Sequence, residues 1–207
     1  MNTDISYTPI DTDVLNFMRY VCFGDIANPY ETASNDAYRD MCRTLRFHGF
    51  SEENRLKLRS SVTAMLQQEI KRLILKNVKS QAEYDAWHYE LCTRIRAIYR
   101  EQGIEFHYGQ AQKWLNMTMK YLYLIGECTF DGLFQYLHVP VDNYLIDIAW
   151  KELGVAHPQT SWSRWNDYAE QYEAYQKELR TKIIGCFPLR WEFRHWLKAA
   201  QQQARKI

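Results

Sequence analysis

The feature that most constrains the fold of this chain is an apolar run at 114–124, WLNMTMKYLYL, which directly follows Lys113. Its apolar residues recur at helical spacing, and only a narrow polar strip interrupts them. That strip contains Asn116 and Lys120, and it begins at Gln112 or Lys113. A helix that is apolar on nearly all sides is buried, so we expect this segment to run through the middle of a core. A lysine at its entrance therefore needs an explanation.

The rest of the chain shows the same spacing. Only 8 Gly and 5 Pro interrupt the sequence, and no segment has the alternation of a strand. We predict an all-α protein in which 1–207 forms one compact domain. The expected helices are 12–22, 31–47, 52–76, 81–102, 109–125, 130–137, 142–153, 163–184 and 189–205.

Length and charge set limits on function. A chain of 207 residues with 46% hydrophobic residues can bury one sizeable core. The net charge of +1 gives no global signal for nucleic acid, although Arg39, Arg43 and Arg46 lie one helical turn apart. This stripe is either a solvated face or a phosphate-binding strip. The polar start and the absence of an 18-residue apolar run predict a soluble, cytoplasmic protein without membrane contact.

Metal and disulfide sites are not expected. The five cysteines are scattered without a CxxC pair, and the six histidines never stand at ligand spacing beside cysteine or carboxylate. We interpret the cysteines as buried thiols, and we predict no metal and no cofactor.

A second polar residue enters an apolar helix at HVPVDNYLIDIA, residues 138–149. Pro140 fixes the direction of the chain there, and Asp142 is expected to cap the helix that follows. Taken singly, both polar residues have structural interpretations. The aspartate can serve only as a cap, and Lys113 can extend its stem to place its ammonium group in solvent.

Taken together, these motifs resemble the helix-hairpin-helix DNA glycosylases, in particular their 8-oxoguanine DNA glycosylase and lyase branch. The family has Gly-x-Gly-x-Lys entering a hydrophobic helix and Val-Pro-Val-Asp entering the next, and this chain has GQAQK at 109–113 and VPVD at 139–142. The resemblance covers 104–153, the hairpin and catalytic segment. It implies a helix-hairpin-helix glycosylase-like fold of two helical lobes, without the N-terminal β domain of the eukaryotic enzymes.

The resemblance also implies roles for individual residues. Lys113 takes the place of the nucleophile and Asp142 that of the essential aspartate. DNA-binding positions are Gly109, Gln110, Gln112, Asn116 and Lys120, and base-pocket positions are His107, Trp114 and Asn143. Ala111 replaces the second hairpin glycine, and an insert, GECTFDGLFQYL, lengthens the segment before Asp142. We therefore expect this hairpin to bind phosphate differently or more weakly.

The implied function is that of a DNA N-glycosylase with AP-lyase activity, acting on an oxidised or modified base in bacterial base-excision repair or antiphage defence. A neutral amine can attack C1′ of the deoxyribose, and the resulting Schiff base permits β-elimination. The alternative is a non-catalytic helical module of the same fold that binds DNA or another protein. The expected partner is DNA with a modified or damaged base.

Overall fold

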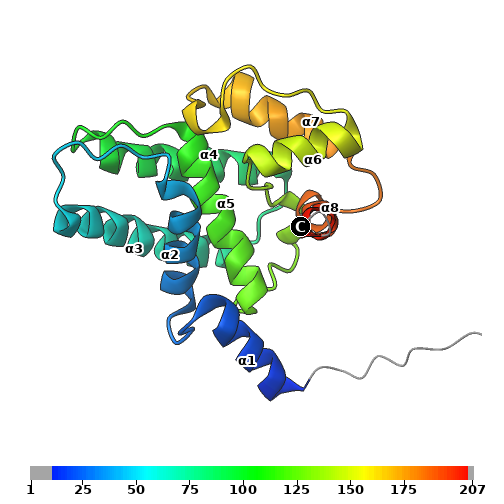
Figure 1. Cartoon of the computed structure of the whole chain (residues 1–207), viewed down its shortest axis with the longest axis horizontal. Coiled ribbons are helices and arrows are strands. Elements are labelled where there is room, and N and C mark those ends of the chain that lie inside the picture. The colour runs from blue at the N-terminus through cyan, green and yellow to red at the C-terminus, as the bar shows by residue number, and fades with distance from the viewer. Residues whose placement is uncertain (1–10, 205–207) are drawn as a thin grey trace, which may run out of the picture.

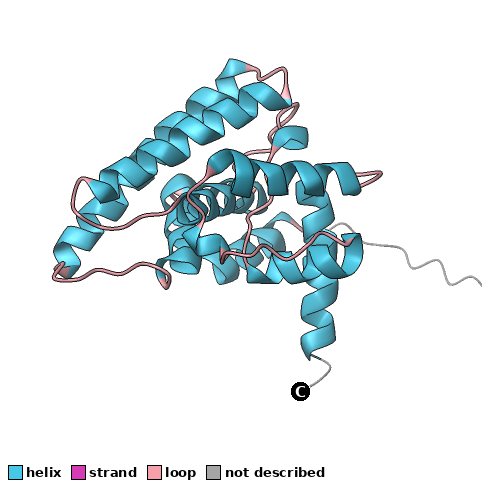
Figure 2. Ribbon diagram, turned by 90° about the horizontal axis from the view of Figure 1, so that it is seen from above, coloured by secondary structure: helices cyan, strands magenta, loops and turns pink. Residues whose placement is uncertain are grey.

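The computed structural model describes residues 11–204 of the chain, with side chains up to Gln201. Every regular element in this range is helical, and loops join them (Figure 2). The predicted all-α class is therefore confirmed. In chain order the elements are α1 (Thr12–Phe23), α2 (Pro29–Cys42), α3 (Glu52–Lys76), α4 (Gln81–Arg100), α5 (Tyr108–Ile125), η1 (Phe134–Tyr136), α6 (Asn143–Leu153), η2 (Trp162–Arg164), η3 (Tyr168–Glu173), α7 (Ala174–Lys182) and α8 (Pro188–Ala204).

Helix α5 lies at the centre of the molecule (Figure 1). Trp114 and Leu115 are wholly buried, and every residue from Tyr108 to Lys120 lies in the interior. Helix α2 packs along α5 more extensively than any other element, and α4 packs on it as well. The prediction that the apolar run crosses the core is confirmed.

The other helices fall into two groups around α5. Helices α1 to α4 form the first group, in which α3 packs against α2 and α4. The second group runs from η1 to α8, and in it α6 contacts both α7 and α8. Helix α1 extends away from the rest and has no buried residue (Figure 1). None of the helices within residues 11–204 has the combination of length and apolarity that crossing a membrane requires.

Three predicted helices are shorter or more broken than expected. Helix α2 ends at Cys42 rather than near 47, and the expected helix at 130–137 is reduced to η1 after Phe130 adopts a left-handed φ of 55°. The expected helix at 163–184 is interrupted because Trp165 is extended. Helical structure resumes as the π-helical η3, capped by Asp167. The last prediction, 189–205, extends beyond the described residues by one position.

The interpretation of all five cysteines as buried thiols is correct for only two of them. Cys92 and Cys128 are buried, but Cys22 is exposed and the other two are half-buried. The reason for Cys22 is that it lies on α1, which packs too little to bury any residue.

Candidate active site

Lys113 and Asp142 meet at the junction of the two groups of helices. The Nζ of Lys113 donates to Oδ2 of Asp142 over 2.5 Å. Oδ1 of the same carboxylate accepts the amide hydrogen of Leu145 over 2.8 Å and caps α6. Lys113 is only 5% exposed, whereas the Asp142 side chain is 29% exposed. The lysine therefore does not extend into solvent, and its ammonium group is held by a partner that solvent can reach.

A cavity of about 750 Å³ opens beside this pair. Its wall combines two ion pairs with a majority of aromatic and apolar side chains. The lining residues are Asp40, Arg43, Lys113, Met117, Lys120, Tyr121, Leu124, Asp142, Asn143, Tyr144, Trp162, Glu192, Phe193, Trp196 and Leu197. Such a wall suits a flat, partly polar ligand.

The second ion pair of the cavity joins α5 to α8. Lys120 Nζ donates to Glu192 Oε1 over 2.7 Å, and the two side chains are 10% and 4% exposed. The ammonium group also lies 5.1 Å from the ring centre of Phe193 and 5.8 Å from that of Trp196. Oε2 of Glu192 is buried and has no hydrogen-bond partner among the described residues, so this acceptor is left unsatisfied.

Lys120 was expected to contact DNA from a polar strip, and the structure instead places it in this cavity. Glu192 was not among the expected site residues. Its only signal in the sequence is the segment WEFRHW at 191–196, where this acid stands among aromatic residues at helical spacing.

The hairpin glycine has a packing role. The amide hydrogen of Gly109 is donated to Trp165 O over 3.0 Å, and a Cβ at this position would lie 1.7 Å from Trp162 O. Glycine is thus needed for the close approach of η2 to α5. The expectation that Gly109 binds a DNA phosphate needs correction, because η2 covers its backbone.

Three of the other expected DNA or base contacts lie in the core. Gln112 is fully buried, and Asn116 is bonded to His88 and Tyr172. Trp114 is also fully buried, and its Nε1 donates to Ser34 O over 3.0 Å. None of the three can touch DNA in this conformation. The polar side chains of this strip on α5 form hydrogen bonds with polar groups of neighbouring elements. The strip therefore does not face solvent.

The remaining expected contacts lie near the start of α5 or of α6. Gln110 is 2% exposed; it accepts from the amide of His107 and donates to Thr44, so it caps α5 and ties it to the end of α2. The expected DNA contact of Gln110 is corrected accordingly. His107 precedes α5, lies 3.5 Å from Glu105 and does not line the cavity. Asn143 is exposed and does line the cavity, next to Asp142.

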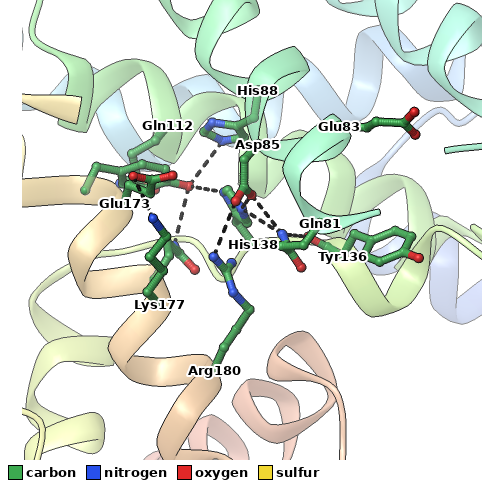
Figure 3. A network of polar contacts seen from close by, with 12 residues as sticks. Gln81, Glu83, Asp85, His88, Gln112, Tyr136, His138, Glu173, Lys177 and Arg180 are labelled. Carbon is green, nitrogen blue, oxygen red and sulfur yellow. Dashed lines mark hydrogen bonds and ion pairs between the residues drawn. The ribbon is translucent and has the colours of Figure 1, made fainter. Parts of the chain in front are cut away.

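A buried polar network joins α4, α5, η3, α7 and the loop that contains His138, and Figure 3 shows part of it. His138 shares a hydrogen bond of 2.7 Å with Asp85 and one of 2.8 Å with Tyr172. Arg180 lies 3.6 Å from Asp85, and His88 contacts both Asn116 and Tyr172.

Burial lowers the pKa of His138, although the Asp85 carboxylate opposes the shift. Burial holds the pKa of His88 well below its usual value, and the neighbouring His138 lowers it further. Burial raises the pKa of Asp85, but its contacts with His138, Gln81 and the Arg180 guanidinium together outweigh that effect and the net shift is downward. Both imidazoles are therefore neutral near pH 7, and the carboxylate is ionised.

Among the residues that the structure describes, no three His, Cys, Asp or Glu side chains gather as metal ligands would. The wall of the cavity carries two lysines, three carboxylates and one arginine among its aromatic and apolar side chains. Comparison of the chain with protein families, with curated proteins and with solved structures gave no match.

Proposed function

We propose that this protein is a DNA N-glycosylase with AP-lyase activity, in a helix-hairpin-helix glycosylase-like fold, which removes an oxidised or modified purine or cytosine. The observation that carries the proposal is the contact of 2.5 Å between Lys113 and Asp142 at the edge of the aromatic cavity. A primary amine beside a carboxylate is the minimum that Schiff-base chemistry at a sugar requires. The resemblance of the two motifs to the glycosylases supports the same assignment.

The reaction begins when Lys113 passes a proton to Asp142 and becomes a neutral nucleophile. Its nitrogen attacks C1′, and the C1′–N bond to the base breaks with the electron pair leaving on the base, which takes up the proton held by Asp142. Positive charge develops on the sugar in this step, and the carboxylate of Asp142 stabilises it once it is ionised again. The C1′–O4′ bond then opens, O4′ takes up one proton from the lysine nitrogen, and C1′ and that nitrogen are left as the protonated Schiff base. Loss of a C2′ proton then expels the 3′ phosphate with its electron pair.

The cavity supplies a place for the extruded base. Its volume of about 750 Å³ exceeds the space that a purine needs, and Tyr144 and Trp196 present rings 5.8 Å apart, centre to centre, in its wall. A flipped base is read by stacking and by hydrogen bonds to its edge. Lys120 Nζ, which lies near the rings of Phe193 and Trp196, can donate to a carbonyl or ring nitrogen of the base.

The DNA backbone needs a positive surface near the cavity, because a chain of net charge +1 must concentrate its phosphate contacts. Arg43 is exposed and lines the cavity, and Arg39 and Arg46 are exposed on either side of it in sequence. Arg43 and Arg46 lie beyond the end of α2 at Cys42, and Arg39 is paired with Asp36 over 2.6 Å. These three arginines replace the covered hairpin as the proposed phosphate contacts.

Borohydride trapping tests the proposal. The protein is incubated with duplexes containing 8-oxoguanine, another oxidised or modified base, or an abasic site, and the reductant fixes any Schiff base as a covalent complex. We expect an adduct with at least the abasic duplex, and loss of that adduct in Lys113→Gln. Lys79→Gln serves as the control because this lysine lies outside the cavity.

The absence of an adduct on every duplex, with unchanged DNA affinity in Lys113→Gln, would select the non-catalytic module instead. In that case the ion pair and the cap of α6 would be the whole role of Asp142.

A further inference from the structure

We infer that Gln112 is a positioning residue, whose side-chain amide holds the segment 138–142 so that Asp142 faces Lys113. The inference deepens the proposed function and rests on it. Gln112 directly precedes Lys113 in α5, and its partner, Val141, directly precedes Asp142. One side chain thus links the two backbone positions next to the reacting pair.

Two hydrogen bonds join the side chain of Gln112 to the backbone of Val141. The amide hydrogen of Val141 is donated to Gln112 Oε1 over 3.2 Å, and Gln112 Nε2 donates to Val141 O over 2.9 Å. The amide of Gln112 therefore pairs with Val141 much as a neighbouring strand would pair with it. Both residues are fully buried, so water does not compete for these bonds.

The remaining hydrogen-bonding capacity of Gln112 sets the orientation of its amide. The second Nε2 hydrogen is donated to Gly109 O over 2.9 Å, and Oε1 also accepts from Asn116 Nδ2 over 3.0 Å. A primary amide has two donor hydrogens and two acceptor lone pairs, and here all four are used. If the Gln112 amide were rotated by 180°, its NH2 group would face two other donors, the Val141 amide N–H and the Asn116 Nδ2 group. Only one orientation therefore allows all four hydrogen bonds.

The network behind Gln112 anchors the other end of the same segment. Asn116 connects Gln112 to Tyr172, and Tyr172 is bonded to His138 over 2.8 Å. His138 is in turn held by Asp85 of α4, as Figure 3 shows. The segment 138–142 is therefore held at His138 and at Val141, and Asp142 is the first residue beyond the second anchor.

This arrangement matters for rate because Lys113 and Asp142 belong to different elements that are joined by a long loop. A shift of about 1 Å in a reacting group can reduce a rate by about 100-fold. A residue that only satisfied its own polar groups would affect stability alone. A positioning residue affects the rate at saturating substrate and leaves the affinity for DNA unchanged.

The test compares Gln112→Met, which keeps the volume and removes all four bonds, with Leu66→Ala, which lowers stability from α3 without touching the segment. Gln112→Asn, whose amide is one methylene too short to reach Val141, is the second variant. Adduct formation is measured in single turnover at saturating abasic duplex, below the unfolding temperature of each variant. DNA affinity is measured separately by fluorescence anisotropy.

We expect both Gln112 variants to form the adduct at least about tenfold more slowly, given the sensitivity of rates to small displacements, with DNA affinity unchanged. Leu66→Ala should react at the wild-type rate. Hydrogen exchange supplies a readout without activity: the Val141 amide should be protected in the wild type and in Leu66→Ala, and should lose protection in Gln112→Met.

The outcomes separate the two proposals. If the wild type and both Gln112 variants form the adduct at equal rates, this inference is overturned and the proposed function stands. The same holds if the Val141 amide hydrogen exchanges freely in the wild type. A wild-type protein that forms no adduct overturns the proposed function and the positioning role together, even where exchange shows that the contact between Gln112 and Val141 exists.

Discussion

Asp142 divides its two carboxylate oxygens between Lys113 and the first turn of α6. Oδ2 accepts from Lys113 Nζ over 2.5 Å, and Oδ1 accepts from the amide of Leu145 over 2.8 Å. The helix cap thus fixes the carboxylate that faces the amine. The two interpretations of Asp142, cap and charged partner, are therefore compatible.

Asp142→Asn should separate the cap from the charge. The asparagine carbonyl can still accept from Leu145, so the cap remains, whereas the negative charge beside the sugar is lost. We expect adduct formation to slow by about 100-fold, which is typical for loss of one electrostatic group at a transition state. Asp142→Ala loses the cap as well and should unfold about 1 kcal/mol more easily than Asp142→Asn. Equal stability of the two variants, measured by urea unfolding, would contradict the cap.

The pair of Lys120 and Glu192 allows stability and base recognition to be separated. Lys120→Met alone leaves a buried carboxylate without its partner and should cost about 3–5 kcal/mol of unfolding free energy. The double variant Lys120→Met, Glu192→Leu fills the same space with apolar groups and should recover most of that loss. We still expect it to lose discrimination between modified and normal bases. A double variant that discriminates as well as the wild type would remove this pair from base recognition.

Local patterns explain what could be predicted from the sequence. The burial of α5 follows from the composition of 114–124, and the cap at Asp142 follows from its place before an apolar helix. The cavity could not be predicted in the same way. Glu192 pairs with Lys120 across 72 positions, and only the packing of α8 against the rest of the fold creates that contact.

The polar residues of α5 were misassigned for a related reason. Gln112 and Asn116 have the spacing of a solvated strip, and the sequence alone does not reveal that α4 and η3 bring polar side chains to meet them. A buried network and an exposed strip have the same local pattern.

Gly109→Ala tests whether this glycine serves packing. The added Cβ would meet the backbone oxygen of Trp162, so η2 must move, and we expect a loss of about 3 kcal/mol. Gly103→Ala is the control: it has a left-handed φ of 73° with no atom near the new Cβ, and strain alone should cost about 1 kcal/mol. Thermal and urea unfolding measure both. A Gly109→Ala protein as stable as the wild type would mean that η2 does not cover the hairpin in solution.

The neutral histidines predict how stability depends on pH. Burial lowers the pKa of His88 and of His138 in the folded protein, whereas in the unfolded chain each titrates near 6.5. Below about pH 6.5 the unfolded state therefore binds more protons than the folded state, and stability falls as the pH decreases toward the folded pKa values. Each histidine adds a slope of up to about 1.4 kcal/mol per pH unit in that window, and stability is fully present above it. Urea unfolding of the wild type and of His138→Gln on both sides of pH 6.5 measures the effect. The variant should show a shallower slope than the wild type, and an equal slope would mean that His138 is protonated to the same extent in the folded and unfolded states.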